Sequence, residues 1–161
     1  GLCLLGLAKK RPVRIGVSIG VAAELRDNEL YGKAIADAYE LESYIAQYPR
    51  VVLSDEVLNY LLDYANTECD KNEFECQITK KMAQASLEML SRDFDGRVII
   101  NYLGDFFRNH LMGDVDIEIY MLAKSYIDEQ LKEHQEEQNS KLAFRYAMLQ
   151  GYFYEHFGDN K

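Results

Sequence analysis

Residues 29–57, ELYGKAIADAYELESYIAQYPRVVLSDEV, place a turn, a helix and a strand within one short stretch. Gly32 opens the expected helix, and apolar residues recur along it at helical spacing: Ala34, Ala38, Leu41 and Ile45. Pro49 ends the helix, because the residue before a proline is pushed out of the α region. Residues 51–53, Val-Val-Leu, then predict a short buried strand. Such a compact unit is typical of a larger sheet.

The residues before this stretch predict a second strand over 12–20. Its apolar residues alternate with polar residues or glycine: Val13, Ile15, Val17 and Ile19. Gly16 and Gly20 would let another backbone or a ligand approach closely. Residues 26–28, Arg-Asp-Asn, predict a turn, and residues 29–31 predict the returning strand. We therefore expect a hairpin ahead of the helix.

The chain after the opening stretch is mainly helical in pattern. Ser54 or Asp55 would cap one helix, and a further helix is expected over residues 74–91. The Asp-Gly pair at 95–96 predicts a turn, and residues 97–103 then predict a strand. Residues 104–113 form a loop or short helix rich in aromatic side chains.

Two long helices are expected to close the chain. Their apolar stripes are Val115, Ile119, Leu122 and Tyr126 in the first, and Leu142, Tyr146, Leu149 and Phe153 in the second. The short hydrophilic segment 132–141 between them favours an antiparallel hairpin. Because strands dominate the first half of the chain and helices the second, the predicted fold class is α+β.

Composition limits the possible partners. The chain has 161 residues, with 18 Lys+Arg against 27 Asp+Glu and a formal net charge of −9. An acidic surface repels phosphate backbones, so we expect no broad nucleic-acid binding. No apolar run approaches the length that crosses a bilayer, so we expect no membrane partner.

The cysteines and the first residues raise two further questions. Cys3, Cys69 and Cys76 are odd in number, and reduced thiols in a cytosolic protein are the simplest interpretation. A bond between Cys69 and Cys76 is the alternative.

The leucine-rich start, GLCLLGLAKKRP at 1–12, has no initiator Met, and we interpret it as the end of an apolar segment whose beginning is missing. A frayed native end or a tag remnant is the alternative.

Three segments in this order, RIGVSIG at 14–20, ELYGKAIADAYELES at 29–43 and YPRVVLSDEV at 48–57, resemble the C-terminal half of class III nucleotidyl cyclase domains. The family pattern is a strand with two glycines, a hairpin, a Gly-opened helix and a strand that ends near Ser or Thr. The AYELES and YPR segments, the Asp-Gly turn and RYAMLQGYF at 145–153 resemble a bacterial branch. That branch looks like the pyrimidine nucleotide cyclases of Pycsar antiphage systems.

The resemblance implies a fold and a division of the chain. Residues 1–66 would be the C-terminal half of a ferredoxin-like cyclase core, with antiparallel strands plus helices. Residues 67–161 would be a mostly helical extension with one strand near 97–103. The two metal-binding aspartates of the family precede the segment that corresponds to residue 12. Mn or Mg is therefore expected for a full-length parent, and this chain alone is expected to bind no metal and to lack activity.

The resemblance also implies a substrate-binding surface, for which the candidate residues are Glu29, Tyr31, Gly32, Tyr39 and Glu40. The carboxylate of Glu29 could accept a hydrogen bond from the exocyclic amine of a base, or be only an exposed hairpin charge. Tyr31 could stack on a base, line a dimer cleft or cover the start of the helix. Core packing is the main expectation for Tyr39. Catalytic residues stay unassigned.

Two positions on the helix depart from the adenylate cyclases of this class. Where those enzymes carry Asn and, four residues later, Arg, this chain has Ala36 and Glu40. Ala36 has no polar group, and the carboxylate of Glu40 would repel a triphosphate, although the bacterial branch has Glu there too. Asp37 is expected to be a solvated charge.

Other polar and aromatic residues have simpler expected roles. Arg14 could meet a phosphate or form a surface salt bridge, and Arg50 could hold Glu42 or Asp55 or reach a partner chain. Three histidines without metal-ligand spacing are expected at the surface: His110, His134 and His156. A terminal aromatic cluster predicts helix packing, with a dimer contact as the alternative: Tyr146, Tyr152, Phe153, Tyr154 and Phe157.

Three hypotheses for the function follow. The first is a fragment of a homodimeric, cytoplasmic cyclase that converts a pyrimidine nucleoside triphosphate to a cyclic mononucleotide and pyrophosphate in antiphage signalling. The second is a catalytically silent cyclase-like module for binding or dimerisation. The third is a helical interaction domain unrelated to cyclases, in which residues 12–31 and 50–53 would not pair in one sheet.

Overall fold

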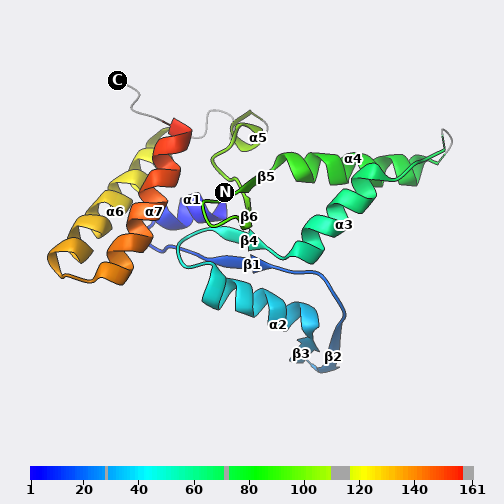
Figure 1. The fold of residues 1–161 in the computed structure, drawn as a ribbon, viewed down its shortest axis with the longest axis horizontal. Helices are drawn as coiled ribbons and strands as arrows, with labels where there is room; N and C mark the ends of the chain where they lie inside the picture. The colour runs from blue at the N-terminus through cyan, green and yellow to red at the C-terminus, as the bar shows by residue number, and fades with distance from the viewer. Residues whose placement is uncertain (28, 71–72, 110–116, 158–161) are drawn as a thin grey trace. The chain divides into compact units, whose positions relative to one another are not determined.

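The computed structural model describes residues 1–27, 29–70, 73–109 and 117–157, and shows a mixed α/β chain. Its contacts group the chain into two compact units (Figure 1). We call residues 15–45 and 51–101 the sheet unit, and residues 1–14, 46–50 and 102–161 the helical unit. The expected cyclase boundary at residue 66 stays a prediction.

The sheet unit is built on four short strands in the order β1-β4-β6-β5. Their bounds are Ile15–Val17 for β1, Val51–Leu53 for β4, Val98–Ile100 for β6 and Leu90–Arg92 for β5. β1 and β4 are parallel, whereas β4–β6 and β5–β6 are antiparallel. All three residues of β4 are buried. The predicted strand at 51–53 is thus confirmed, and it pairs with residues 15–17, a pairing that the third hypothesis did not expect.

The hairpin and the helix predicted from the opening stretch both form. β2 (Ala22–Arg26) and β3 (Glu29–Gly32) pair as a separate two-stranded antiparallel sheet. α2 (Lys33–Glu40) follows β3 directly and continues into a π-helical turn, η1 (Leu41–Ile45). The helical backbone therefore ends at Ile45, a few residues before Pro49. The strand expected over 12–20 is shorter, because pairing with β4 involves only Ile15–Val17.

Gly16 allows α2 and η1 to lie directly against β1. A Cβ atom at this position would collide with the carbonyl oxygen of Ala38 and would lie 2.8 Å from both the backbone nitrogen of Glu42 and the Cβ of Leu41. Only a residue without a side chain permits this approach. Leu41 is buried, and Ala34, Ala38 and Ile45 are half-buried, so the predicted apolar stripe faces inward.

Two helices, α3 (Asp55–Asn66) and α4 (Phe74–Glu88), pack against each other in the sheet unit (Figure 1). Ser54 is the N-cap of α3, and its hydroxyl accepts a hydrogen bond from the backbone nitrogen of Val57 at 3.4 Å. The helix expected over 74–91 stops earlier, because β5 begins at Leu90 and pairs with β6. The tail of that predicted helix was therefore wrong.

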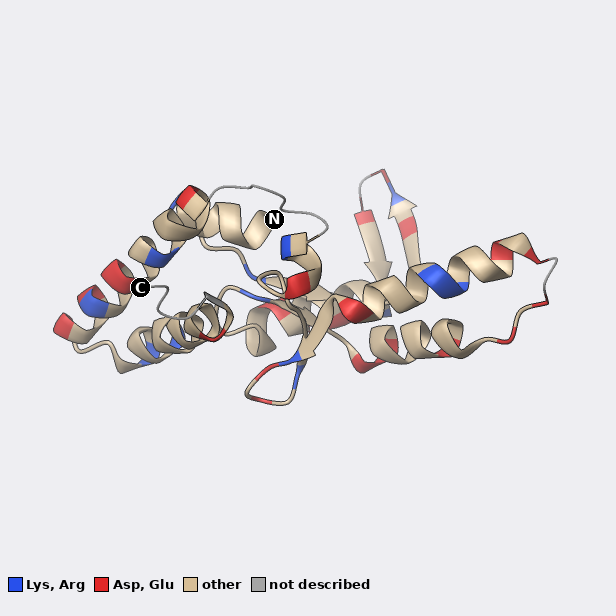
Figure 2. Ribbon diagram, turned by 90° about the horizontal axis from the view of Figure 1, so that it is seen from above, with Lys and Arg blue, Asp and Glu red and all other residues tan. Residues whose placement is uncertain are grey.

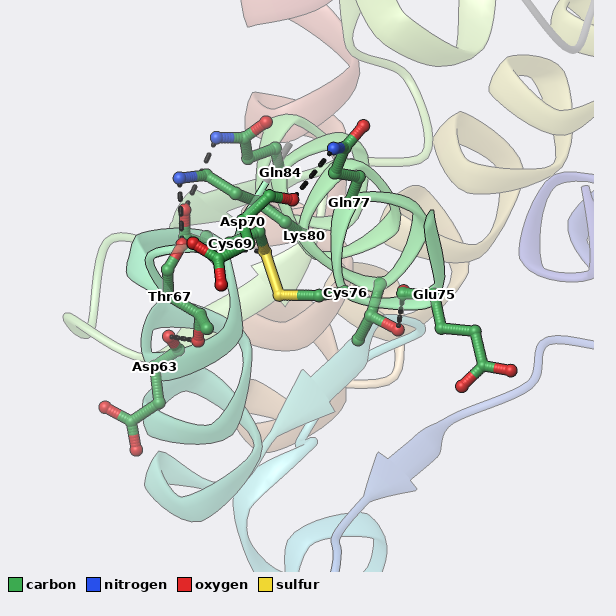
Figure 3. The surroundings of a disulfide bond; sticks show 11 residues. Asp63, Thr67, Cys69, Asp70, Glu75, Cys76, Gln77, Lys80 and Gln84 are labelled. Carbon is green, nitrogen blue, oxygen red and sulfur yellow. Dashed lines mark hydrogen bonds between the residues drawn. A yellow bond between two sulfur atoms is a disulfide. The ribbon is translucent and has the colours of Figure 1, made fainter. Parts of the chain in front are cut away.

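Cys69 and Cys76 are joined by a disulfide, so the expectation of reduced thiols was wrong for this pair. The bond ties the segment after α3 to the first turn of α4 (Figure 3). Side chains of α4 support the same segment: Lys80 donates to the carbonyl of Thr67 at 3.0 Å, and Gln77 donates to that of Asp70 at 3.2 Å. Cys3 is a free thiol, and burial raises its pKa to about 11.

The helical unit has its core where α1 and α7 meet α6. α1 (Leu2–Ala8) buries Cys3, Leu4 and Leu7 and packs on α6. α6 (Ile117–Glu136) and α7 (Ser140–Phe157) contact each other along their lengths. The leucine-rich start is thus a packed helix in this structure. The short helix α5 (Asp105–Phe107) falls in the expected aromatic-rich segment, of which residues 110–113 lie outside the described residues.

The last two helices are antiparallel, as predicted. The ring of Tyr120 stacks on that of Phe153 with centroids 5.4 Å apart, and Gln150 donates to Asp128 at 2.7 Å. Contacts thus join early residues of one helix to late residues of the other. Part of the segment expected as a linker, 132–141, is helical, since α6 runs to Glu136 and α7 begins at Ser140. The expected stripe residue Val115 lies outside the described residues.

Replacing Gly16 with Ala should lower the free energy of unfolding of the sheet unit by about 1 to 3 kcal/mol, because the added methyl overpacks the contact with α2. Gly151 on α7 is the matched control, since a Cβ there meets nothing within 4 Å. Gly151→Ala should raise the stability of its helix by about 0.5 to 1 kcal/mol. Urea unfolding followed by hydrogen exchange measures both, and equal effects would contradict the packing role of Gly16.

Removing the disulfide should loosen the connection between α3 and α4. The bond closes a loop with a sequence separation of 7, for which chain entropy predicts a stabilisation of roughly 2 to 3 kcal/mol. Amide exchange in the first turn of α4 should speed up on reduction, and equally in a Cys69→Ser/Cys76→Ser double variant. Reductant should then have no further effect on that variant. Unchanged exchange in both cases would show that the bond contributes nothing to local stability.

Candidate functional site

The five predicted substrate-binding residues lie on one continuous strand-and-helix segment of the sheet unit. Glu29, Tyr31 and Gly32 belong to β3, and Tyr39 and Glu40 belong to α2, which follows β3 directly. All five are exposed. Tyr31 retains 53% of its accessible surface and Tyr39 retains 63%. The segment therefore presents an open surface.

Glu29 and Tyr31 point to the same face of β3, because side chains alternate along a strand. The Tyr31 hydroxyl donates to a carboxylate oxygen of Glu29 at 3.5 Å. Glu29 pairs in register with Arg26 across the hairpin, next to a bulge in β2. The exposed Glu29 carboxylate keeps oxygen lone pairs that can accept further hydrogen bonds.

Gly32 has a structural role that explains its identity. Its φ of +154° is rarely adopted by residues with a side chain, and a Cβ there would lie 2.7 Å from the Cα of Ala22 and collide with the carbonyl oxygen of Val21. This close approach lets β3 pair with the start of β2 at the point where the chain enters α2. A contact between Gly32 and a substrate stays a prediction.

Tyr39 does not pack in the core, so that expectation was wrong. Its ring lies edge-to-face against Tyr44, with centroids 6.5 Å apart, and both rings are exposed. The neighbouring residue Ala38 faces β1 at Gly16, and successive residues of a helix are rotated by about 100° from one another. Tyr39 consequently turns away from the sheet. The result is a pair of accessible aromatic rings.

The exposed face of α2 carries no cation at Ala36 or Glu40, the two positions that the resemblance compares with Asn and Arg. Ala36 and Glu40 are both exposed. Lys33 is bound to Asp37 one turn away and lies 3.9 Å from Glu56. The Asp37 hydrogen bond, with the charge of that carboxylate, raises the pKa of Lys33. Asp37 is thus an ion-paired, half-buried residue rather than a fully solvated one.

The histidines and arginines outside this segment have specific contacts. His134 is buried, against expectation, and its Nδ1 lies 3.3 Å from a carboxylate oxygen of Glu137. His156 is half-buried, and His110 lies outside the described residues. Arg50 is only 2% exposed, and its guanidinium lies over the Tyr48 ring at 4.6 Å from the centroid.

Within the described ranges, no group of three or more His, Cys, Asp or Glu could hold a metal ion.

Three members of the terminal aromatic cluster, Tyr146, Tyr152 and Phe153, pack against other aromatic residues of the helical unit, as predicted. Tyr152 and Phe153 are buried, and the Tyr152 hydroxyl accepts a hydrogen bond from the backbone nitrogen of Leu103 at 3.1 Å. Tyr146 lies against Tyr126 with their hydroxyl oxygens 3.4 Å apart. Tyr154 is more exposed, at 43%, and the side chain of Phe157 lies outside the described residues.

A cleft in the helical unit was not predicted as a site. Its lining includes Arg14, Tyr48, Arg145 and Tyr146, and its volume is about 140 Å³. The sequence places these residues on three distant segments. Only the two arginines, in a chain with a formal net charge of −9, could have drawn attention to it.

Comparison with known proteins gives no relative: no family model, no curated protein and no solved structure matches the chain. Among the helices that the structure describes, none is long and apolar enough to cross a membrane.

The pKa of His156 should lie below its ordinary value of 6.5, chiefly because burial disfavours the charged ring and also because Arg108 is near. The unfolded chain then binds the proton at a higher pH, so stability should fall as the pH drops through 6.5. NMR titration of the His156 ring checks the pKa directly. His156→Gln should weaken the loss of stability between about pH 7 and 5.5, and an unchanged loss would assign it to other groups.

Proposed function

We propose that this chain forms the base-facing part of a nucleotide cyclase that converts a pyrimidine nucleoside triphosphate to a cyclic mononucleotide and pyrophosphate. The observation that carries the proposal is the order of elements between RIGVSIG and YPRVVLSDEV. β1 is connected to the parallel strand β4 by a hairpin and α2, with Gly32 between them. Gly16 and Gly32 both lie where another backbone segment comes too close for a side chain. The ferredoxin-like core is part of the same proposal.

The reaction is an intramolecular displacement on the α-phosphate of the substrate. The ribose O3′ forms a bond to that phosphorus and loses its proton, while the bond to the β-phosphate oxygen breaks and pyrophosphate leaves. A divalent cation, Mn or Mg in the full-length parent, would activate the hydroxyl and neutralise the triphosphate. Glu29, Tyr31 and Tyr39 of this chain would bind and orient the base.

Each of these residues has a distinct part in binding the base. The Glu29 carboxylate would accept a hydrogen bond from the exocyclic amine of cytosine, whereas uracil offers a carbonyl at that position. The exposed rings of Tyr31 and Tyr39 would stack on the base, since stacking on aromatic side chains tolerates any base. The carboxylate of Glu40 disfavours a nearby triphosphate, so the phosphate charge must be met by groups elsewhere in the enzyme.

The open surface suggests that a second copy completes the site. Apolar side chains of the hairpin segment are left uncovered, with Val21 83%, Leu25 68% and Leu30 61% exposed. A homodimer would cover these side chains and enclose the base, because exposed apolar patches of this kind mark interaction sites. Proposed partners are thus a nucleoside triphosphate and a second copy of the chain.

The proposal places the protein in the cytoplasm, in antiphage signalling. Cytoplasmic reductants keep most thiols reduced, so Cys69 and Cys76 would be a dithiol there. The disulfide of the structure then corresponds to an oxidised state of the protein. The compartment can be tested by trapping free thiols in cells with an alkylating reagent before lysis.

A catalytically silent cyclase-like module, used for binding or dimerisation, is the alternative. Ala36 and Glu40 favour it, because neither position can stabilise developing negative charge. This alternative predicts dimerisation without turnover. The absence of either metal-binding aspartate from a full-length parent would support it.

Cyclase activity should appear when a full-length parent is expressed and supplied with manganese. CTP or UTP should yield the cyclic monophosphate and pyrophosphate, with ATP and GTP as comparison substrates. Glu29→Ala should lower kcat/KM for CTP about tenfold or more and leave that for UTP less affected, since only cytosine loses a charge-assisted hydrogen bond. Inactivity with all four nucleotides would contradict the enzymatic proposal.

A further inference from the structure

The cleft in the helical unit has walls that are held in place by buried contacts. Tyr48 on one wall is 3% exposed, and the adjoining Pro49 carbonyl accepts a hydrogen bond from the Tyr102 hydroxyl at 3.3 Å. Tyr146, also in the lining, contacts the Tyr126 hydroxyl and the His134 ring, whose centroid lies 5.5 Å away. The cleft is therefore a preformed feature of this unit.

The lining of the cleft is positively charged in an acidic protein. Arg14 and Arg145 both line it, and none of its lining residues is acidic. α7 contributes Lys141 and Arg145 in its first two turns and has no acidic residue before Glu155. Figure 2 colours the basic residues of the chain blue and the acidic residues red. Against the formal net charge of −9, this concentration of guanidinium groups favours an anion.

The Arg145 side chain, which lines the cleft, has an unsatisfied hydrogen-bond donor. Its Nε is buried and has no hydrogen-bond partner among the described residues. A buried donor without a partner costs about 1 to 3 kcal/mol, so such groups are usually satisfied by water or by a ligand. A guanidinium is a planar fork of donors, which matches the geometry of a carboxylate or phosphate. The guanidinium of Arg145 is thus a suitable donor group for an oxyanion in the cleft.

The remaining lining is suited to a flat apolar group. Pro12, Tyr48, Pro49 and Leu142 supply apolar surface beside the two arginines, and Gln47 adds one amide. The cleft volume of about 140 Å³ lies below the roughly 300 to 1,000 Å³ typical of sites for drug-sized ligands, so the cleft suits one small ring and not a larger molecule. Arginine together with aromatic and apolar walls is suited to a ring that carries a charged substituent.

We propose that this cleft binds a small organic oxyanion, a phosphate or carboxylate attached to a flat ring. Arg145 and Arg14 bind the oxyanion, and Tyr48, Leu142 and Tyr146 contact the ring. The site shares no residue with the surface formed by β3 and α2, and it lies in the other compact unit. It therefore stands or falls independently of the cyclase proposal.

The test is a two-dimensional NMR titration that observes arginine Nε–H groups and backbone amides. Phenyl phosphate and benzoate should each produce saturable shifts at the Arg145 Nε–H and at the Gln47 and Tyr48 amides. Inorganic phosphate lacks the ring, and phenol lacks the oxyanion. Each should bind about tenfold more weakly than whichever of phenyl phosphate and benzoate binds more tightly. The ranking of phenyl phosphate against benzoate identifies the preferred oxyanion.

Variants of Arg145 distinguish the effect of the guanidinium geometry on binding from the effect of its positive charge alone. Arg145→Gln should weaken binding at least about tenfold, and Arg145→Lys should restore only part of it, because lysine keeps the charge without the fork. Arg97→Gln is the matched control, since this exposed arginine lies in the sheet unit and its loss changes net charge equally. Arg14→Gln provides a second test if the Arg145 variants alter the amide spectrum.

The proposal would be overturned by any of three results. No saturable shift at the cleft with any probe up to about 20 mM would remove the site. Equal responses to phenol and phenyl phosphate would show a merely apolar cleft. Unchanged affinity in both Arg145→Gln and Arg14→Gln, with shifts elsewhere in the chain, would place the anion at another site.

Discussion

The packing of α2 and η1 on β1 at Gly16 determines the arrangement of the sheet unit. The helix backbone lies so close to the strand that a single methyl group at Gly16 would meet Ala38, Leu41 and Glu42 at once. This contact orients α2 about its axis. It turns Leu41 inward and Tyr39 outward, and so decides which side chains the helix presents to solvent. Gly32 sets the other end of the helix in the same way, by allowing β3 to enter α2 beside β2.

The strength of local patterns explains which elements the sequence predicts. The alternation around Ile15 and Val17, the apolar run at 51–53 and the Ser54 cap are each decided within a few residues, and each occurs as expected. β5 depends instead on pairing with β6, and no local pattern separates Leu90 from the end of α4. Tertiary pairing overrides helix propensity at that point.

The sequence predicts which strand or helix carries each candidate site residue, but it does not predict the burial and contacts of their side chains. The sequence places Glu29, Tyr31 and Tyr39 on β3 and α2, yet the exposure of Tyr39 follows from the rotation of α2 on Gly16. The burial of His134 depends on how α6 and α7 pack, and the disulfide depends on the geometry after α3. The cleft around Arg145 joins segments that are distant in the chain, so one-dimensional patterns carry no signal for it.

The central claim is that the exposed side of β3 and α2 binds a pyrimidine base. Its most direct test is to titrate CTP with magnesium into the full-length parent while observing the ring signals of Tyr31 and Tyr39 and the Glu29 amide by NMR. The account predicts saturable shifts at all three positions, and weaker binding of UTP. Shifts confined to the Arg145 cleft, or none at β3 and α2, would contradict it.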